Sequence, residues 1–256
     1  MAPQSCRRIS GNTMDEQIAF FKKNGYVVIP AALSATEVAG LNQALDIDRQ
    51  KYPQLWPERG EGGRSQSVSV LLTSTAFDCT IRHPAVLPLL GALMGEELCF
   101  AELSVMVRAP LDQEPSPPVW HRDKENWPEH PLALHNISAV YYLTDVDAST
   151  HCFGVVPEGL EAKMASPTDR DGTNGVELYG RAGTVILFNA GSVHAGVVRR
   201  TVRDRRTIHI YYGHRSQPPL SNHTIFPRRL LEAKDEATRL FYSRPNLMTQ
   251  LICDNF

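Results

Sequence analysis

Short apolar runs alternate with turn-rich segments through the second half of the chain, and this pattern limits the fold more than any other feature. The runs start at Leu98, and the segments between them are rich in Pro, Gly, Ser and Asp. Short strands separated by such turns are typical of antiparallel sandwiches and barrels. We therefore predict a β-rich core with strands within residues 98–109, 136–146, 152–157, 183–191 and 206–213.

Helices are expected before this core. Residues 15–23 begin with acidic and end with basic side chains, which suits the helix dipole. A Ser-Ala-Thr-Glu sequence with capping-box spacing opens a helix over residues 34–50, and a helix that is entered at a proline is expected over residues 83–95. Residues 26–29 indicate a strand, and residues 51–67, rich in Pro, Gly and charge, indicate a surface loop. Helices first and strands afterwards favour the α+β class.

Composition excludes several classes of protein. The 256 residues are 42% hydrophobic and 21% charged, which are ordinary globular values, and the net charge of -2 argues against a nucleic-acid partner. The chain has no apolar run of about 18 residues and no secretory h-region, so we expect a cytoplasmic protein without a membrane partner. The cysteines are scattered and form no CxxC pair, which disfavours a disulfide framework or a thiolate zinc site.

The tripeptide His121-Arg122-Asp123 has two possible meanings. HRD opens the catalytic loop of protein kinases, which also requires an asparagine five residues after the aspartate and a later DFG sequence. Pro128 stands at that position, and no DFG occurs in the chain. The kinase interpretation is therefore excluded, and a metal site remains.

A metal site needs partners for this histidine and aspartate. On an extended segment, residues two apart point to the same side, so His121 and Asp123 can face one ion. His194 follows the apolar segment 183–188 and a turn, and it can complete the two-histidine, one-carboxylate triad that is typical of non-haem iron(II). The alternatives are a surface turn for the first pair and a loop histidine bonded to backbone for His194.

A cation follows the last candidate ligand. Arg205 stands eleven residues after His194 and starts a strand in which Thr207 and His209 share its side, whereas isoleucines alternate on the other. We expect the isoleucine side to pack away from the cavity, and a guanidinium in the cavity can bind a carboxylate through two parallel hydrogen bonds. The alternative is a solvated turn, which we expect for the neighbouring Arg199, Arg200 and Arg203.

Five segments, in this order, resemble the phytanoyl-CoA dioxygenase (PhyH) family. Its members are iron(II)- and 2-oxoglutarate-dependent oxygenases built on a double-stranded β-helix, or jelly roll. The similar segments are residues 20–45, 82–95, 120–123, 183–196 and 205–213.

The resemblance implies one domain over residues 1–256. Residues 1–97 would form a mainly helical flank with the first strand, residues 98–215 the cupin-like jelly-roll core, and residues 216–256 a C-terminal extension.

The resemblance also implies the chemistry of the site. His121, Asp123 and His194 would hold Fe(II), and Arg205 would bind the distal carboxylate of 2-oxoglutarate. With O2, such an enzyme hydroxylates or otherwise oxidises a small-molecule substrate and releases succinate and CO2. Asp123 is a carboxylate, whereas the related halogenases carry alanine or glycine, so hydroxylation is favoured over chlorination.

Further residues are candidates by position. Arg108 and Thr207 are assigned to the cosubstrate, and Trp127, Tyr141 and His209 to the substrate. The alternatives are a surface charge for Arg108, a packing role for Trp127 and a core histidine for His209. Only one of two adjacent tyrosines on the strand that carries Tyr141 can face the cavity.

Two positions depart from the family pattern. Arg122 fills a slot that is commonly glutamine, and we expect its side chain to point away from the metal and form an ion pair. Residues 157–160, Pro-Glu-Gly-Leu, replace a PGSH-like turn, which we expect to alter the substrate mouth.

Two other functions remain open. A cupin-like metal-dependent hydrolase or isomerase would keep the triad but has no need for a buried arginine at position 205. A catalytically silent binding module on the same fold has no physical reason to keep all four groups.

Overall fold

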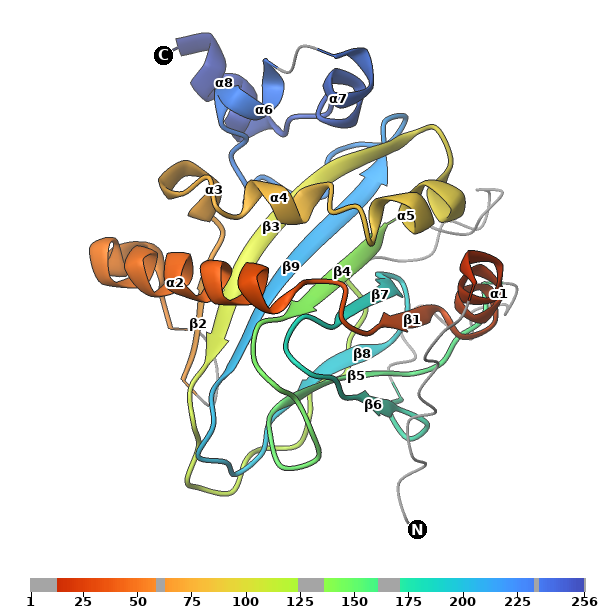
Figure 1. Cartoon of the computed structure of the whole chain (residues 1–256), viewed down its shortest axis with the longest axis vertical. Helices are drawn as coiled ribbons and strands as arrows, with labels where there is room; N and C mark the ends of the chain where they lie inside the picture. The colour runs from red at the N-terminus through yellow and green to blue at the C-terminus, as the bar shows by residue number, and fades with distance from the viewer. Residues whose placement is uncertain (1–12, 59–62, 124–135, 161–170, 233–234, 256) are drawn as a thin grey trace.

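Two antiparallel sheets form the centre of the protein (Figure 1). The computed structural model describes residues 13–58, 63–123, 136–160, 171–232 and 235–255. The larger sheet has the order β1 (Tyr26–Ile29), β7 (Val185–Asn189), β4 (Ile137–Tyr142), β9 (Arg205–His214), β3 (Leu98–Arg108), β2 (Arg64–Ser67). The smaller sheet has the order β6 (Val176–Leu178), β5 (Cys152–Val155), β8 (His194–Val197). This β-rich jelly-roll core with flanking helices confirms the predicted fold class.

Helices cover one face of the larger sheet. In Figure 1, α2, α3, α4 and α5 lie in front of it, and α6 to α8 gather near the start of β3. The N-terminal helical elements are α1 (Met14–Asn24), α2 (Ala35–Lys51), η1 (Pro53–Leu55), α3 (Val70–Thr73), α4 (Asp78–Ile81) and α5 (Leu87–Met94). The C-terminal ones are α6 (Arg228–Leu231), α7 (Glu236–Phe241) and α8 (Leu247–Asn255).

The ends of the first two helices follow from their sequences. Ser34 and Glu37 form the predicted capping box of α2, with the Ser34 side chain accepting from the Glu37 amide and Glu37 accepting from the Ser34 amide at 2.7 Å. Helix α1 ends at Gly25, which adopts φ 72°. A Cβ at Gly25 would also lie 2.5 Å from the Glu158 carbonyl oxygen, so only glycine allows this close approach.

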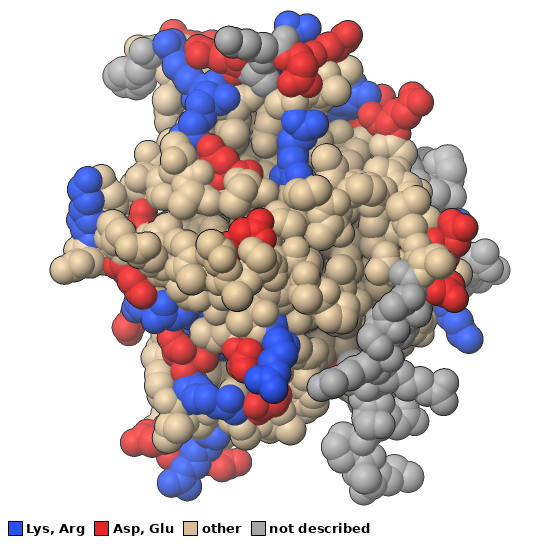
Figure 2. Space-filling model, viewed as in Figure 1, with Lys and Arg blue, Asp and Glu red and all other residues tan. Residues whose placement is uncertain are grey.

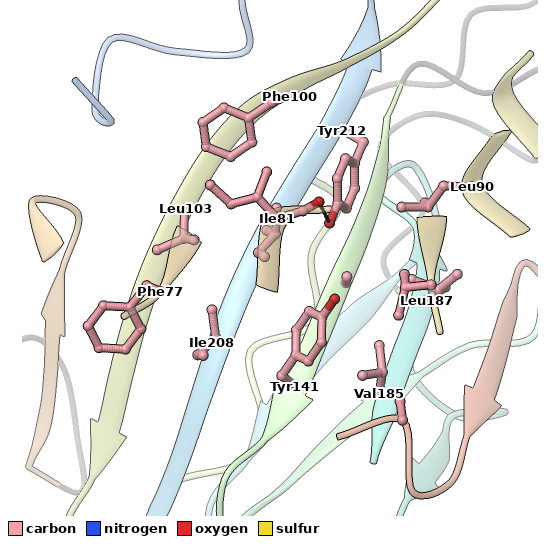
Figure 3. Close-up of a cluster of buried hydrophobic side chains, with 14 of the residues drawn as sticks. Phe77, Ile81, Leu90, Phe100, Leu103, Tyr141, Val185, Leu187, Ile208 and Tyr212 are labelled. Atoms are coloured by element: carbon pink, nitrogen blue, oxygen red, sulfur yellow. Dashed lines mark hydrogen bonds between the residues drawn. The ribbon is translucent and has the colours of Figure 1, made fainter. Parts of the chain in front are cut away.

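The main hydrophobic core lies between the larger sheet and the helices (Figure 3). The strands supply alternate residues to it, among them Leu103 of β3 and Ile208 of β9. Two tyrosines of this core donate to the helical layer, Tyr141 to the carbonyl of Thr80 at 2.9 Å and Tyr212 to that of Ile81 at 2.9 Å. The isoleucine side of β9 therefore packs away from the cavity, as predicted.

The prediction that Tyr141 contacts the substrate is wrong. Its side chain is fully buried among the core residues in Figure 3, and its hydroxyl is bonded to the helical layer. The adjacent Tyr142 points to the other side of the sheet, where it joins a second apolar cluster with Phe153 and Phe188. The sequence allowed only one of the two tyrosines to face inward, and the pairing of β4 within the sheet decides which.

Some boundaries differ from those predicted. Helix α5 begins at Leu87 because residues 84–86 form a turn, and residues 51–67, predicted as a loop, contain η1 and strand β2. Strands β6 and β8 were not separately predicted. These strands are short, and β2 is polar, so hydrogen bonding to a neighbouring strand determines their conformation more than local composition does. The N-terminal flank, residues 1–97, therefore contributes two strands, β1 and β2, whereas one was predicted.

Charges of both signs are interspersed over the face shown in Figure 2. The arginine-rich turn after β8 contacts acidic side chains, with Arg203 2.8 Å from Asp147. Arg199 is half-buried and pairs with Glu177, so it is less solvated than predicted. Among the described residues, no helix is long and apolar enough to cross a membrane. A cytoplasmic location stays a prediction.

Replacing Tyr141 with phenylalanine tests the corrected placement. The change leaves the buried Thr80 carbonyl without this donor, so we expect the free energy of unfolding to fall by about 1–2 kcal/mol in a urea titration. Because the hydroxyl lies on the core side of the sheet, the affinity for 2-oxoglutarate should stay unchanged. A variant with native stability and weakened ligand binding would contradict this placement.

Candidate functional site

His121, Asp123 and His194 converge as the sequence predicted. One ligand atom from each lies within 4.8 Å of the others. His121 Nε2 is 3.5 Å from Asp123 Oδ1, and His194 Nε2 is 3.3 Å from Asp123 Oδ2. Reciprocal backbone hydrogen bonds of 3.0 and 2.9 Å join His121 to His194, so two segments far apart in sequence present their imidazoles side by side.

The hydrogen bonds of both histidines direct their Nε2 atoms to one point. His121 Nδ1 lies 3.0 Å from the Val119 carbonyl oxygen, and His194 Nδ1 lies 2.9 Å from that of Ser192. A carbonyl oxygen only accepts, so each Nδ1 carries a proton and each ring turns its other nitrogen, Nε2, toward Asp123. Two Nε2 atoms and a carboxylate that face one another can share protons or, once those protons are released, bind a metal cation. The donor set therefore fits a divalent metal, and non-haem iron(II) in particular.

Tyr211 completes the surroundings of the carboxylate, and the sequence analysis did not select it. Its hydroxyl donates to Asp123 Oδ2 at 2.5 Å. Burial by itself would raise the pKa of Asp123, but hydrogen bonds from His121, His194 and Tyr211 outweigh it and hold the pKa well below its usual range. The signal was present in the alternation of β9, where Tyr211 shares the side of Arg205.

A cavity of about 520 Å³ contains this triad. Its apolar wall includes Phe153 and Phe188, whose rings lie 5.5 and 4.7 Å from the His194 ring, centroid to centroid. Three arginines, Arg64, Arg108 and Arg205, line the same cavity. The candidate metal ligands and the predicted carboxylate-binding groups therefore share one pocket between the two sheets.

The three arginines occupy neighbouring positions on adjacent strands. Arg64 of β2 pairs with Arg108 of β3, which in turn pairs with Arg205 of β9, so all three point to the same face. Gly196 of β8 lies opposite, where a Cβ would be 3.5 Å from Arg108 Nη2 and 3.9 Å from Arg205 Nη2. Burial lowers the pKa of the Arg205 guanidinium, which donates to the Cys152 carbonyl oxygen. Arg205 is therefore not part of a solvated turn.

The remaining candidates on β9 lie beside this row. Thr207 Oγ1 is 3.0 Å from His209 Nε2, and both side chains are buried. His209 lines the cavity, whereas Thr207 is not among its lining residues. Burial, together with the charge of Arg205, lowers the pKa of His209 to about 3, so this imidazole is neutral near pH 7. Trp127 lies outside the described residues.

Arg122 points away from the triad, as predicted. Its side chain is 6% exposed and forms an ion pair with Glu158, with Nη1 at 2.6 Å from Oε2 and Nη2 at 2.7 Å from Oε1. Glu158 belongs to the 157–160 turn, so the two positions that depart from the family pattern contact one another.

Sequence comparison supports the resemblance. The family model described as Phytanoyl-CoA dioxygenase (PhyH) matches residues 21–207, which is more than half of the chain. A search of curated proteins gives no significant match.

Solved structures with similar folds include two enzymes that depend on 2-oxoglutarate (alpha ketoglutarate) and one that was crystallised with it bound. The epimerase SnoN from nogalamycin biosynthesis is 23% identical with a TM-score of 0.63, covering 78% of this chain and 83% of its own. The carbocyclase SnoK from the same biosynthesis is 22% identical with a TM-score of 0.63, covering 84% and 87%. HygX from Streptomyces hygroscopicus, with nickel, 2-oxoglutarate and hygromycin B bound, is 18% identical with a TM-score of 0.59, covering 78% and 86%. At these identities the likeness shows the fold.

Tyr211→Phe removes the donor to the triad carboxylate. We expect the affinity for Co(II), measured by calorimetry, to fall about 10–100-fold, the usual effect of losing a partner of a metal ligand. Tyr179→Phe is the matched control, because it removes a phenol–carboxylate hydrogen bond to Glu177 outside the cavity. Equal Co(II) affinity in Tyr211→Phe and the unsubstituted protein would show that this hydrogen bond does not position Asp123.

The low pKa of His209 predicts a pH dependence of stability. In the unfolded chain, His209 is protonated below its ordinary pKa of 6.5. In the folded protein, it stays neutral until the pH falls to about 3. The free energy of unfolding of the metal-free protein should therefore decrease as the pH falls through this window, with a His209 contribution of up to about 1.4 kcal/mol per pH unit. His209→Gln should flatten the slope, whereas exposed His223→Gln should not. Identical slopes in all three proteins would refute the prediction.

Proposed function

Since the chain belongs to the phytanoyl-CoA dioxygenase family, we propose that it hydroxylates or otherwise oxidises a small-molecule substrate, with release of succinate and CO2. Membership makes it an iron- and 2-oxoglutarate-dependent oxygenase. The convergence of His121, Asp123 and His194 in one cavity with Arg205 carries the proposal for this site.

His121, Asp123 and His194 would hold the iron. The Nδ1 hydrogen bonds orient the two imidazoles, and the Tyr211 hydroxyl orients the Asp123 carboxylate, before any metal binds. Three protein ligands leave coordination positions for a cosubstrate and dioxygen. When bound, iron and 2-oxoglutarate together supply the activation of O2. The part of the protein is to orient the ligands and to keep water away from the reaction.

Arg205 would bind the distal carboxylate of 2-oxoglutarate, assisted by Arg108 and Thr207. Arg205 is 5% exposed, and a desolvated guanidinium forms strong charge-assisted hydrogen bonds with a carboxylate. Arg108 reaches the same stretch of β8 from the adjacent strand, so the two forks can share one anion. The Thr207 hydroxyl lies two residues along β9 on the same side and is bonded to His209.

The substrate would occupy the rest of the cavity near the exposed edge of His121. The His121 side chain is 42% exposed, whereas that of His194 is 6% exposed, so the cavity opens beside His121. Neutral His209 can hydrogen-bond a polar group through Nδ1 because Nε2 contacts Thr207. SnoN crystallised with nogalamycin RO and HygX with hygromycin B, which supports a small molecule as the substrate.

A metal-dependent hydrolase or isomerase is less well supported. Hydrolysis needs a metal and a water, but not a buried guanidinium at the inner end of the cavity. Burying Arg205 disfavours its charge, and a bound carboxylate offsets that cost. The buried arginine thus favours a mechanism with a dianionic cosubstrate.

Anaerobic reconstitution tests this proposal. With Fe(II) and 2-oxoglutarate, the protein should develop a weak visible charge-transfer band, and O2 should then yield succinate. Arg205→Gln should weaken 2-oxoglutarate binding about 10–100-fold, the loss expected for a charged hydrogen-bonded pair, whereas exposed Arg203→Gln should not. His121→Ala should abolish the band. If the unsubstituted protein gave no band and no succinate, the proposed function would be refuted.

A further inference from the structure

We propose that Arg122 and Glu158 act together as positioning residues that set the spacing of the metal ligands. Arg122 stands between His121 and Asp123, and its side chain leaves the extended segment on the side opposite to theirs. Its guanidinium forms two parallel bonds to the Glu158 carboxylate, at 2.6 and 2.7 Å, an arrangement that fixes direction as well as distance. This inference rests on the proposed metal site.

The pair connects the HxD segment to the loop that precedes His194. Arg122 Nη1 also donates to the Gly191 carbonyl oxygen at 2.5 Å. Glu158 Oε2 accepts from the Val193 amide at 3.3 Å. Two charged side chains, with opposite hydrogen-bonding capacity, therefore hold the short loop before His194 at Gly191 and Val193.

Glu158 is itself anchored outside the site. Its amide donates to the Asn24 carbonyl oxygen at 3.0 Å, and its own carbonyl oxygen lies against Gly25 at the end of α1. The neighbouring Val156 amide donates to the Val193 carbonyl oxygen at 2.8 Å. The Glu158 residue is thus fixed by the end of α1 and by the backbone just after β5, so its carboxylate can serve as a reference point for Arg122.

Backbone bonds alone hold the ligand segment at two points. His121 pairs with His194, and the Asp123 amide donates to the Ala190 carbonyl oxygen at 3.1 Å. These bonds restrain the two ligand residues but leave the intervening peptide able to rotate. The Arg122 guanidinium adds a third connection on the far side of the segment. It would hold the His121 and Asp123 ligand atoms at the separation that one ion requires.

The two residues also form a unit by their identity. Arg122 is the positive partner and Glu158 the negative partner of one ion pair. The Arg122 charge would not be tolerated well alone, because its side chain is 6% exposed and an unpaired buried charge is costly. The arginine at position 122 therefore depends on the carboxylate at position 158.

A double-mutant cycle tests the proposal with Co(II) alone, without cosubstrate. We expect Arg122→Gln and Glu158→Gln each to lower Co(II) affinity about 10-fold or more and to alter the visible absorption spectrum of the bound ion. The double variant should bind no more weakly than the weaker single variant, because the two side chains act through each other. Arg199→Gln is the matched control, since it breaks another part-buried arginine–glutamate pair outside the cavity.

The possible outcomes are distinct. The single variants could melt at a lower temperature when metal-free and still bind Co(II) as tightly as the unsubstituted protein. This result would show that the pair has only a structural role, and it would overturn the proposal. The proposal would also be overturned if the loss of Co(II) affinity in the double variant equalled the product of the two single losses, because the residues would then act independently. Arg122→Lys, which keeps the charge but loses the two parallel bonds, should fold and bind Co(II) more weakly than the unsubstituted protein. Failure of the unsubstituted protein to bind Co(II) would instead refute the metal site itself.

Discussion

Strand β9 is the constraint on which both the core and the site depend. It is hydrogen-bonded on both sides, to β4 and to β3, so its side chains cannot rotate from one face to the other without breaking two ladders. One face carries Ile208 and Ile210 into the helix-covered core. The other carries Arg205, His209 and Tyr211 into the cavity. Packing of the apolar face therefore fixes the register of the functional face.

The site is ordered before a metal binds because few of its groups can move separately. His121 and His194 are joined through their backbones, and each imidazole is oriented by a carbonyl oxygen of its own segment. Tyr211 restrains the carboxylate from β9. Aromatic rings cover His194, which lowers the local polarity and strengthens the electrostatic contacts around it. Such preorganisation reduces the free energy needed to assemble the centre when metal and cosubstrate arrive.

Much of the fold could be predicted from local patterns. The apolar strands, the α2 capping box and the charge pattern of α1 were all recognisable because they depend on neighbouring residues. Strand β2 was predicted as loop because Arg-Ser-Gln-Ser has no apolar alternation, and it forms a strand by pairing with β3. Tyr141 was assigned to the wrong face because two adjacent aromatic residues give no sign of which one faces the helices.

The sequence by itself determined the kinds of chemistry available: two histidines and a carboxylate for a metal, an arginine on an alternating strand for an anion, and a β-rich core to carry them. Only the tertiary structure decided that Tyr211 donates to Asp123, that Arg64 and Arg108 line up with Arg205, and that Arg122 meets Glu158. The reason is physical. Contacts along a strand or helix follow from periodicity, whereas contacts between segments far apart in the chain depend on strand register and loop packing, which all the buried residues determine together.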